Sequence, residues 1–274
     1  MGERAHTVGL IGAGIDASLS PALHEAEAAA LGLSYEYRLL EIDGHALPDL
    51  LEHARAAGFS GVNVTHPCKQ DVVALLDDLS PEAAALDAVN TVVFDGDRSI
   101  GHNTDASGFA ESFRRGLRDA PLGKVVVLGA GGAGSAVAHA ALRLGARDLV
   151  IVDVDSTRAA ALAHRLGART GALDELLDAD GLIHATPTGM AAHPGLPLPE
   201  ALLRSDLWVA EVVYRPLETE LVKRARELGC RTLDGGGMAV MQAAGSLELF
   251  TGVTPDRERM LRHLAQLIEP VGAR

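Results

Sequence analysis

Residues 124–153, KVVVLGAGGAGSAVAHAALRLGARDLVIVD, restrict the fold of this 274-residue chain more than any other stretch. An apolar run leads directly into Gly129-Ala-Gly131-Gly-Ala-Gly134, a helical pattern follows, and a second apolar run ends at Asp153. In a nucleotide-binding βαβ unit such glycines allow a tight turn, a close approach of the backbone to pyrophosphate, and close helix–strand packing. The helix N-terminus then offers N–H groups to the phosphates. The stretch predicts a Rossmann-type, doubly wound dinucleotide-binding domain.

A second glycine motif, Gly12-Ala-Gly14, follows the first apolar run of the chain. A phosphate-binding helix must begin inside its glycine motif, whereas here the helix signal comes later, at Ser20-Pro21. Serine is a favoured N-cap and proline is favoured at the first helical position. Ser18 and Ser20 would present two hydroxyls at a helix N-terminus, which suits a carboxylate. The alternative for Ser20 is helix capping without a ligand.

Short apolar runs alternate with alanine-rich helical patterns along most of the chain, which predicts an α/β fold with βαβ units and parallel sheet. The expected strands are residues 7–11, 34–40, 61–65, 91–94, 125–128, 149–153, 181–185, 207–212 and 232–233. The expected helices are residues 21–31, 47–57, 70–76, 107–116, 133–144, 157–166 and 219–228. Pro121 and Gly123 mark a domain boundary. Two last helical segments, near 237–252 and 255–270, either cap the second domain or return to the first.

The charge balance limits the partners of the protein. Lys and Arg total 24 against 37 Asp and Glu, so the formal net charge of −13 argues against nucleic acid or an anionic membrane, although a small anionic substrate is allowed. Cys68 and Cys230 form no CxxC pair and are expected as small buried side chains in a reducing cytoplasm. No apolar run approaches the roughly 18 residues of a membrane span, and no signal peptide is evident. We expect a cytoplasmic protein.

Three stretches carry polar residues where an apolar core is otherwise expected: GVNVTHPCK with Thr65 and Lys69, AVNTVV with Asn90, and GHNTDASGF with Asp105. Ligands of open α/β sheets gather at the carboxyl ends of strands, so these loops are candidate site segments. The alternatives are a solvated lysine at position 69 and a helix cap or Asx turn at position 105. The eleven histidines form no HxxxH or His/Cys cluster, so no metal is expected.

Asp153 ends the second strand of the nucleotide-binding unit, where an acid accepts hydrogen bonds from the adenosine ribose. The 2′-phosphate of NADP would face this carboxylate, and Asp155 adds to the repulsion, so NAD is the expected cofactor. Arg158 leaves NADP possible, because its side chain could lie against adenine or reach a phosphate.

The segments SLSPALH, NVTHPCK, AVNTVV, HNTDASGF, GAGGAGSA, ATPTGM, VVYRPLETEL and GGGMAVMQAA follow one another from residue 18 to the 240s. Their order and spacing resemble the shikimate dehydrogenase family. The acid after LVIV looks more like the NAD-using quinate/shikimate dehydrogenases, since NADP-using members typically carry Asn-Arg-Thr at Asp153-Val154-Asp155. The resemblance implies a substrate-binding and catalytic domain of residues 1–106 plus 240–274, and an NAD(P)-binding Rossmann domain of residues 107–239.

The resemblance also implies functional residues. Lys69 and Asp105 would form the catalytic pair. Substrate binding would involve Ser18, Ser20, Thr65, Asn90, Tyr214 and Gln242. Cofactor binding would involve Gly129, Gly131, Gly132, Ala133, Gly134, Asp153, Arg158, Thr186, Val213 and Gly235. The chain departs from the family pattern at His184, where the family usually has asparagine, and we expect a core or surface histidine there.

Removing hydride from a secondary alcohol requires that the hydroxyl proton leave to a general base within hydrogen-bond reach. Lys69 is the expected acid/base group, with Asp105 orienting it and binding the same hydroxyl. The resemblance thus implies an NAD-preferring quinate/shikimate dehydrogenase, acting reversibly at the C3 hydroxyl of shikimate or quinate, as a monomer or homodimer. The alternatives are an NADP-dependent shikimate dehydrogenase, a homologue acting on an amino analogue, a non-catalytic dinucleotide-dependent regulator, and a folate-linked dehydrogenase. The last is disfavoured by the NTD and double-serine motifs.

Overall fold

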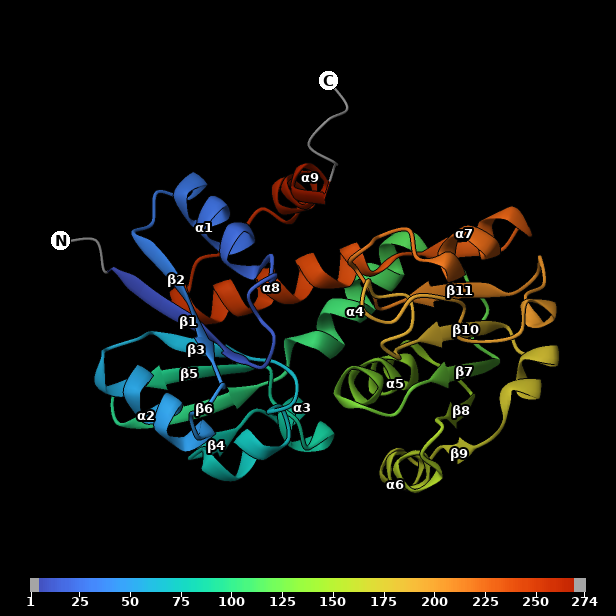
Figure 1. The fold of residues 1–274 in the computed structure, drawn as a ribbon, viewed down its shortest axis with the longest axis horizontal. Helices are drawn as coiled ribbons and strands as arrows, with labels where there is room; N and C mark the ends of the chain where they lie inside the picture. The colour runs from blue at the N-terminus through green and yellow to red at the C-terminus, as the bar shows by residue number, and fades with distance from the viewer. Residues whose placement is uncertain (1–4, 269–274) are drawn as a thin grey trace. The chain divides into compact units, whose positions relative to one another are not determined.

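The computed structural model describes residues 5–268 and divides the chain into two compact units. The first unit runs to Thr104 and resumes at Val240, and the second runs from Asp105 to Ala239. Helices α4 (Thr104–Gly116) and α8 (Gly235–Thr251) each contribute residues to both units (Figure 1). Residues 1–4 and 269–274, which belong to the expected first domain, lie outside the described residues.

The first unit contains a six-stranded sheet in the order β2-β1-β3-β5-β6-β4. Its strands are β1 (His6–Gly12), β2 (Tyr35–Glu41), β3 (Gly61–Val64), β4 (Asp78–Leu79), β5 (Thr91–Asp95) and β6 (Arg98–His102). β1 is parallel to β2 and β3, whereas β5 is antiparallel to both β3 and β6. The expectation of a parallel sheet is therefore wrong for this part of the unit. Because β5 runs in reverse, its first residues lie at the sheet edge where β1, β3 and β6 end.

Four α-helices and one 3₁₀ helix accompany this sheet in the first unit, besides α8. They are α1 (Ser20–Ala30), α2 (Leu47–Ala56), η1 (Asp71–Leu75), α3 (Pro81–Leu86) and α9 (Arg257–Ile268). The helix expected at 70–76 is the short η1. Nowhere in residues 5–268 does a helix have the length and hydropathy needed to span a bilayer.

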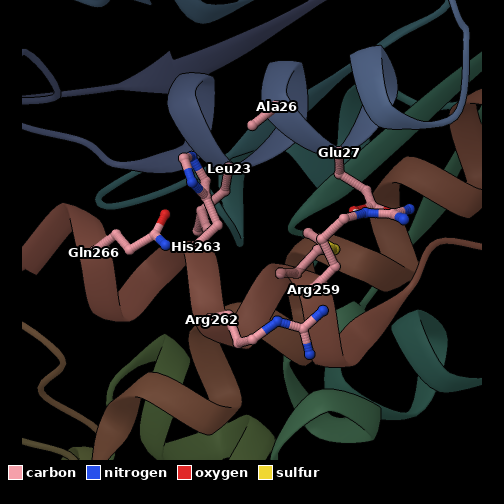
Figure 2. Close-up of a pocket in the computed structure, with 8 residues that line it drawn as sticks. Leu23, Ala26, Glu27, Arg259, Arg262, His263 and Gln266 are labelled. Carbon is pink, nitrogen blue, oxygen red and sulfur yellow. The ribbon is translucent and has the colours of Figure 1, made fainter.

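Helix α9 is fastened to α1 by one ion pair beside a shared apolar cluster. Arg259 donates to both carboxylate oxygens of Glu27, at 2.7 and 2.6 Å, and the Asp256 N–H adds a third bond at 2.7 Å. Figure 2 shows Arg259 reaching Glu27 from the facing helix. The Glu27 side chain is 1% exposed, and three bonds satisfy the otherwise costly buried carboxylate. Buried residues from α1, α8 and α9 pack together: Leu23, Val240, Met241, Ala243, Ala244, Met260 and Leu264.

The second unit contains a fully parallel six-stranded sheet in the order β12-β11-β10-β7-β8-β9. Its strands are β7 (Lys124–Leu128), β8 (Asp148–Val152), β9 (Arg169–Thr170), β10 (Gly181–His184), β11 (Trp208–Glu211) and β12 (Arg231–Leu233). Its other helices are α5 (Gly132–Leu144), α6 (Ser156–Leu166), α7 (Glu220–Glu227) and two 3₁₀ helices, η2 (Leu173–Asp178) and η3 (Glu200–Leu202). The chain starts at β7 and winds first to one side and then to the other, as in the Rossmann fold. The predicted fold class, α/β with a doubly wound domain, is confirmed.

Candidate functional site

Four segments with polar side chains meet at one edge of the sheet of the first unit. Thr65–Lys69 follows β3, Asn90 precedes β5, and Asn103-Thr104 follows β6. The loop after β1 joins them, because the Ala13 N–H donates to the carbonyl of His66 at 3.0 Å. The carbonyl of Lys69 accepts the Val89 N–H at 2.8 Å, which places the Lys69 segment beside Asn90.

Asn90 fixes the start of helix α4. It is 3% exposed, and its Oδ1 accepts the Thr104 N–H at 2.8 Å while its Nδ2 donates to Thr104 Oγ1 at 2.9 Å. Asp105 is the next residue of the chain and is 6% exposed. Since α4 begins at Thr104, Asp105 lies inside the first turn and does not cap the helix.

Sequence reasoning missed one partner of this arrangement, Tyr37, and singled out the other, Asn63, without giving it a role. The Tyr37 hydroxyl donates to Asn63 Oδ1 at 2.9 Å, and Asn63 Nδ2 donates to the Asn90 carbonyl at 3.2 Å and to Thr91 Oγ1 at 3.1 Å. Asn63 lies in an otherwise apolar strand, which is the one sequence signal for a buried polar contact. The pair supports the backbone on which Asn90 is built.

Ser18 ends the loop after β1 and lies beside Ser20, the first residue of α1. The Ser18 hydroxyl accepts the Ser20 N–H and also bonds the Ser20 hydroxyl, both at 3.2 Å. Leu19 is the N-cap of α1 and makes no side-chain cap bond, so the expectation that Ser20 caps the helix is wrong. The two serines bond to each other instead, one from the loop and one from the first residue of α1.

Thr65 packs against the end of β1. A Cβ on Gly12 would lie 2.3 Å from Thr65 Cγ2, so this contact requires glycine. The neighbouring Gly14-Ile15 backbone is occupied by the chain itself, since both N–H groups donate to the Glu41 carboxylate at 2.6 and 3.1 Å. A carboxylate from the same unit thus takes the donors that a phosphate would need.

Gln242 lies on the part of α8 that belongs to the first unit. A Cβ on Gly245 of the same helix would lie 3.3 Å from Thr104 Cγ2, so this helix face packs on the Thr104 segment. Residues three apart share a helix face. Gln242 therefore lies on the face of α8 directed to the same sheet edge.

The glycine loop of the second unit has the form that a dinucleotide requires. Helix α5 begins at Gly132 with Gly131 as N-cap, inside the motif as predicted. A Cβ on Gly134 would lie 2.0 Å from the carbonyl oxygen of Gly129, which adopts φ +108°. In contrast, no atom lies within 4 Å of a Cβ built on Gly131. Packing thus requires glycine at Gly129 and Gly134, whereas Gly131 borders open space at the N-terminus of α5.

Asp153 follows β8 and faces this loop. Its Oδ2 accepts the Ala130 N–H at 2.6 Å and its Oδ1 accepts the Asp155 N–H at 2.9 Å. Asp155 caps α6, and its carboxylate also lies 3.7 Å from the Arg158 guanidinium. Val154, between the two acids, is fully exposed. Two carboxylates therefore gather where the adenosine ribose is expected, and Arg158 lies beside one of them.

The remaining candidate cofactor residues border the same end of the sheet. Thr186 follows β10, and its Cγ2 lies 3.1 Å from a Cβ built on Gly129. A Cβ on Gly235 would lie 2.5 Å from the Val213 carbonyl oxygen, so α8 starts against the loop after β11. Ala133 lies in the first turn of α5. The residues present thus form a glycine cradle and an acid of the kind that NAD(P) requires.

Comparison with known proteins decides the family. A family profile described as the shikimate dehydrogenase substrate binding domain matches residues 10–92. The chain is 59% identical over 283 residues to a shikimate dehydrogenase (NADP(+)) of Streptomyces avermitilis, covering 97% of each chain. It is 47% identical over 271 residues to a quinate/shikimate dehydrogenase (NAD(+)) of Corynebacterium efficiens, covering 92% of this chain and 95% of the relative. The chain belongs to the shikimate dehydrogenase family. Quinate dehydrogenase from Corynebacterium glutamicum in complex with NAD has a similar structure, with a TM-score of 0.92 at 45% identity, over 96% of this chain and 99% of that one.

As a member of the shikimate dehydrogenase family, the protein is an NAD(P)-dependent oxidoreductase acting on a CH–OH group. The first unit contains Ser18, Ser20, Thr65, Lys69, Asn90 and Gln242, and the second contains Asp105, Tyr214 and the candidate cofactor residues. Burial raises the pKa of Tyr214 above its ordinary value, so its hydroxyl is a hydrogen-bond donor at neutral pH. Residues 5–268 contain no group of three His, Cys, Asp or Glu side chains arranged to hold a metal.

Proposed function

We propose that this member of the shikimate dehydrogenase family is an NAD-preferring quinate/shikimate dehydrogenase. It would interconvert the C3 hydroxyl of shikimate or quinate and the corresponding ketone. The observation that carries the proposal is that Lys69 and Asp105 lie on segments that meet at one edge of the sheet of the first unit. The Lys69 carbonyl accepts the Val89 N–H, and the neighbouring Asn90 accepts the N–H of Thr104, the residue before Asp105. The names of the relatives from Streptomyces and Corynebacterium support the substrate class.

Lys69 is proposed as the acid/base group of the reaction. In the direction of oxidation the hydroxyl proton passes to the Lys69 amine as the C–O bond becomes a carbonyl, and in reduction the ammonium returns it. Asp105 would accept a hydrogen bond from an N–H of Lys69 and so orient its nitrogen toward the same hydroxyl. The bound nicotinamide supplies the hydride acceptor or donor. The position of Asp105 supports this role, because it directly follows Thr104, which Asn90 holds beside the Lys69 segment.

Ser18, Ser20 and Thr65 are proposed to bind the substrate carboxylate. Hydroxyl donors suit an anion, and the serine pair already lies at the N-terminal end of a helix. Tyr214 is proposed as a further substrate-binding hydroxyl. Asn90 and Gln242 would bind ring hydroxyls.

The preference for NAD is proposed from the charges beside the glycine loop. Asp153 and Asp155 would face the 2′-phosphate of NADP, which carries the same sign of charge. The names of relatives point in both directions, since the Streptomyces avermitilis enzyme is named for NADP and the Corynebacterium efficiens enzyme for NAD. The proposal therefore rests on the two carboxylates.

Initial rates test the whole proposal. Shikimate, quinate and their amino analogues are each assayed with NAD⁺ and with NADP⁺. The highest kcat/KM is expected for shikimate or quinate with NAD⁺. A higher kcat/KM for an amino analogue would contradict the proposed substrate, and a higher kcat/KM with NADP⁺ would contradict the proposed cofactor preference. Absence of turnover with every pair would contradict the proposed dehydrogenase activity.

Substitution of Asp153 tests the source of the cofactor preference. Removing one carboxylate should narrow the NAD⁺/NADP⁺ ratio of kcat/KM by about tenfold, because like charges about 4 Å apart near a protein surface repel by about 1–4 kcal/mol. The measurement is the ratio in Asp153→Ala against Asp174→Ala, an exposed aspartate on η2. An unchanged ratio in Asp153→Ala would mean that other residues discriminate.

A further inference from the structure

His184 and Glu211 form a fully buried pair at the carboxyl ends of β10 and β11. Their side chains are both 0% exposed, and His184 Nδ1 lies 2.9 and 3.0 Å from the two carboxylate oxygens. Burying a carboxylate is costly unless hydrogen bonds satisfy it, so the partners of Glu211 decide whether the pair is stable. The proposed reaction uses neither residue.

The Glu211 carboxylate ties three segments together. Oε1 accepts the Val213 N–H at 2.9 Å, and Oε2 accepts the Thr219 hydroxyl at 2.9 Å. Thr219 is in turn the N-cap of α7. Because all of its bonds are accepted, the carboxylate requires a hydrogen on His184 Nδ1.

The second ring nitrogen of His184 then acts on Thr186. Nε2 lies 2.5 Å from Thr186 Oγ1, and the two atoms share one hydrogen in either charge state of the ring. The other γ substituent, Cγ2, lies 3.1 Å from a Cβ built on Gly129. The bond to His184 therefore selects which γ group of Thr186 faces the glycine turn.

We infer that His184 and Glu211 are a positioning pair that fixes the rotamer of Thr186 against the glycine turn and thereby shapes the dinucleotide site. A β-branched side chain has few χ1 states, so the hydrogen bonds at Oγ1 fix the whole side chain. The bond to His184 Nε2, at 2.5 Å, is the shorter of the two that Oγ1 makes, and the Thr188 N–H donates the other at 3.3 Å. Neither member of the pair needs to contact the cofactor. The inference rests on the proposed cofactor site of the second unit and not on the identity of the hydroxy acid.

Fluorescence titration of the full chain with NADH tests the inference. Thr186→Val keeps the shape of the side chain but removes the hydroxyl, and should raise the Kd of NADH about three- to tenfold, the effect of one hydrogen bond. Thr186→Ser restores the hydroxyl and should bind NADH more tightly than Thr186→Val. Thr170→Val, an exposed position on β9, is the matched control and should bind as the wild type does.

A double-mutant cycle tests whether His184 acts through Thr186. His184→Asn is too short to join Glu211 to Thr186 and should raise the Kd about as much as Thr186→Val. The double variant should bind no more weakly than Thr186→Val, because that substitution already removes the hydrogen bond between His184 and Thr186. If the increases in the Kd of NADH in the two single variants multiply in the double variant, the inference is overturned. An unchanged Kd in single variants that fold would also overturn it.

Two further comparisons keep the test decisive. If His184→Asn does not fold, Thr186→Val and Thr186→Ser still decide, and equal binding by these two overturns the inference. The KM of the hydroxy acid should stay constant while the KM of NAD⁺ rises, a separation that general loss of structure would not produce. A wild-type protein that binds NADH but oxidises neither shikimate nor quinate would refute the proposed function and leave this test intact.

Discussion

Lys69 lies on a segment whose backbone is fixed on both sides. The Cys68 N–H donates to the Thr65 carbonyl at 2.9 Å, and the Lys69 carbonyl accepts the Val89 N–H at 2.8 Å. Because backbone hydrogen bonds hold this segment, Lys69→Ala should remove the amine without moving the backbone. The substitution should lower kcat by about 10²–10⁴, the usual effect of losing a general acid/base. NADH binding should not change, and stopped-flow and equilibrium titration measure the two quantities. Lys223→Ala, exposed on α7, is the control, and wild-type rates in Lys69→Ala would remove this residue from the mechanism.

His24 makes the stability of the protein depend on pH. It is 1% exposed, lies 2.9 Å from the Tyr35 hydroxyl through Nδ1, and its burial lowers its pKa from 6.5 to about 3. As the pH falls below about 6.5, His24 is protonated in the unfolded chain, whereas in the folded chain it stays neutral until about pH 3. The free energy of unfolding should therefore fall in this window, by at most about 1.4 kcal/mol per pH unit from this group.

Urea denaturation at several pH values measures this dependence. His24→Gln should flatten the curve within the window, whereas His53→Gln, exposed on α2, should leave it as in the wild type. A curve that His24→Gln leaves equally steep would assign the pH dependence to other groups.

At the scale of elements, the sequence predicted the helices and strands that have a clear hydrophobic pattern. It missed the strands that only their pairing with a neighbouring strand defines. The βαβ unit around Gly129 was predicted because its strands are buried on both faces and read as continuous apolar runs. β6, with the sequence RSIGH, was missed because it has one large apolar residue, and its pairing with β5 across the Gly96-Asp97 turn defines it. The edge strands β4 and β9, each of two residues, likewise show no period.

The candidate site shows the same limit. Tyr37 lies on β2 and Asn63 on β3, with β1 between them in the sheet, so their bond at 2.9 Å depends on the strand order. Spacing along the chain contains no such information. Thr65, Lys69 and Asn90 were identified because polar residues interrupt apolar strands, a local signal.

Two glycines of one loop offer a matched test of helix α5. A Cβ on Gly134 would lie 2.0 Å from the Gly129 carbonyl oxygen, whereas a Cβ on Gly131 meets nothing within 4 Å. Gly134→Ala should therefore destabilise the second unit by about 1–3 kcal/mol through overpacking. Gly131→Ala should leave stability unchanged but raise the Kd of NADH, because its methyl group enters the space that pyrophosphate needs. Thermal denaturation without ligand and NADH titration separate the two effects, and normal NADH binding by Gly131→Ala would place the phosphates elsewhere.

At the scale of the whole molecule, the chain divides into two compact units, and each has buried apolar clusters of its own. The core of the second unit gathers residues from its own strands and helices, such as Val126, Val150 and Leu182, and the clusters of the first unit contain only residues of that unit. A ligand stabilises the structure that binds it and no other. A ligand should therefore stabilise most the unit that supplies most of its binding residues.

Trp208 makes the unfolding transitions of the two units distinguishable. It is the one tryptophan of the chain, lies on β11 of the second unit and is 2% exposed, so its fluorescence reports the unfolding of that unit. NAD⁺ at about one hundred times its Kd should raise the free energy of unfolding measured by tryptophan by about 2.7 kcal/mol. Shikimate or quinate alone should raise this value less than NAD⁺ does, because only Asp105 and Tyr214 of the proposed substrate residues belong to the second unit. Either acid should shift the transition seen by far-ultraviolet circular dichroism, which reports both units, more than the tryptophan transition. Urea titrations with each ligand measure both signals, and equal shifts of both by either ligand would show that the chain unfolds as one cooperative body.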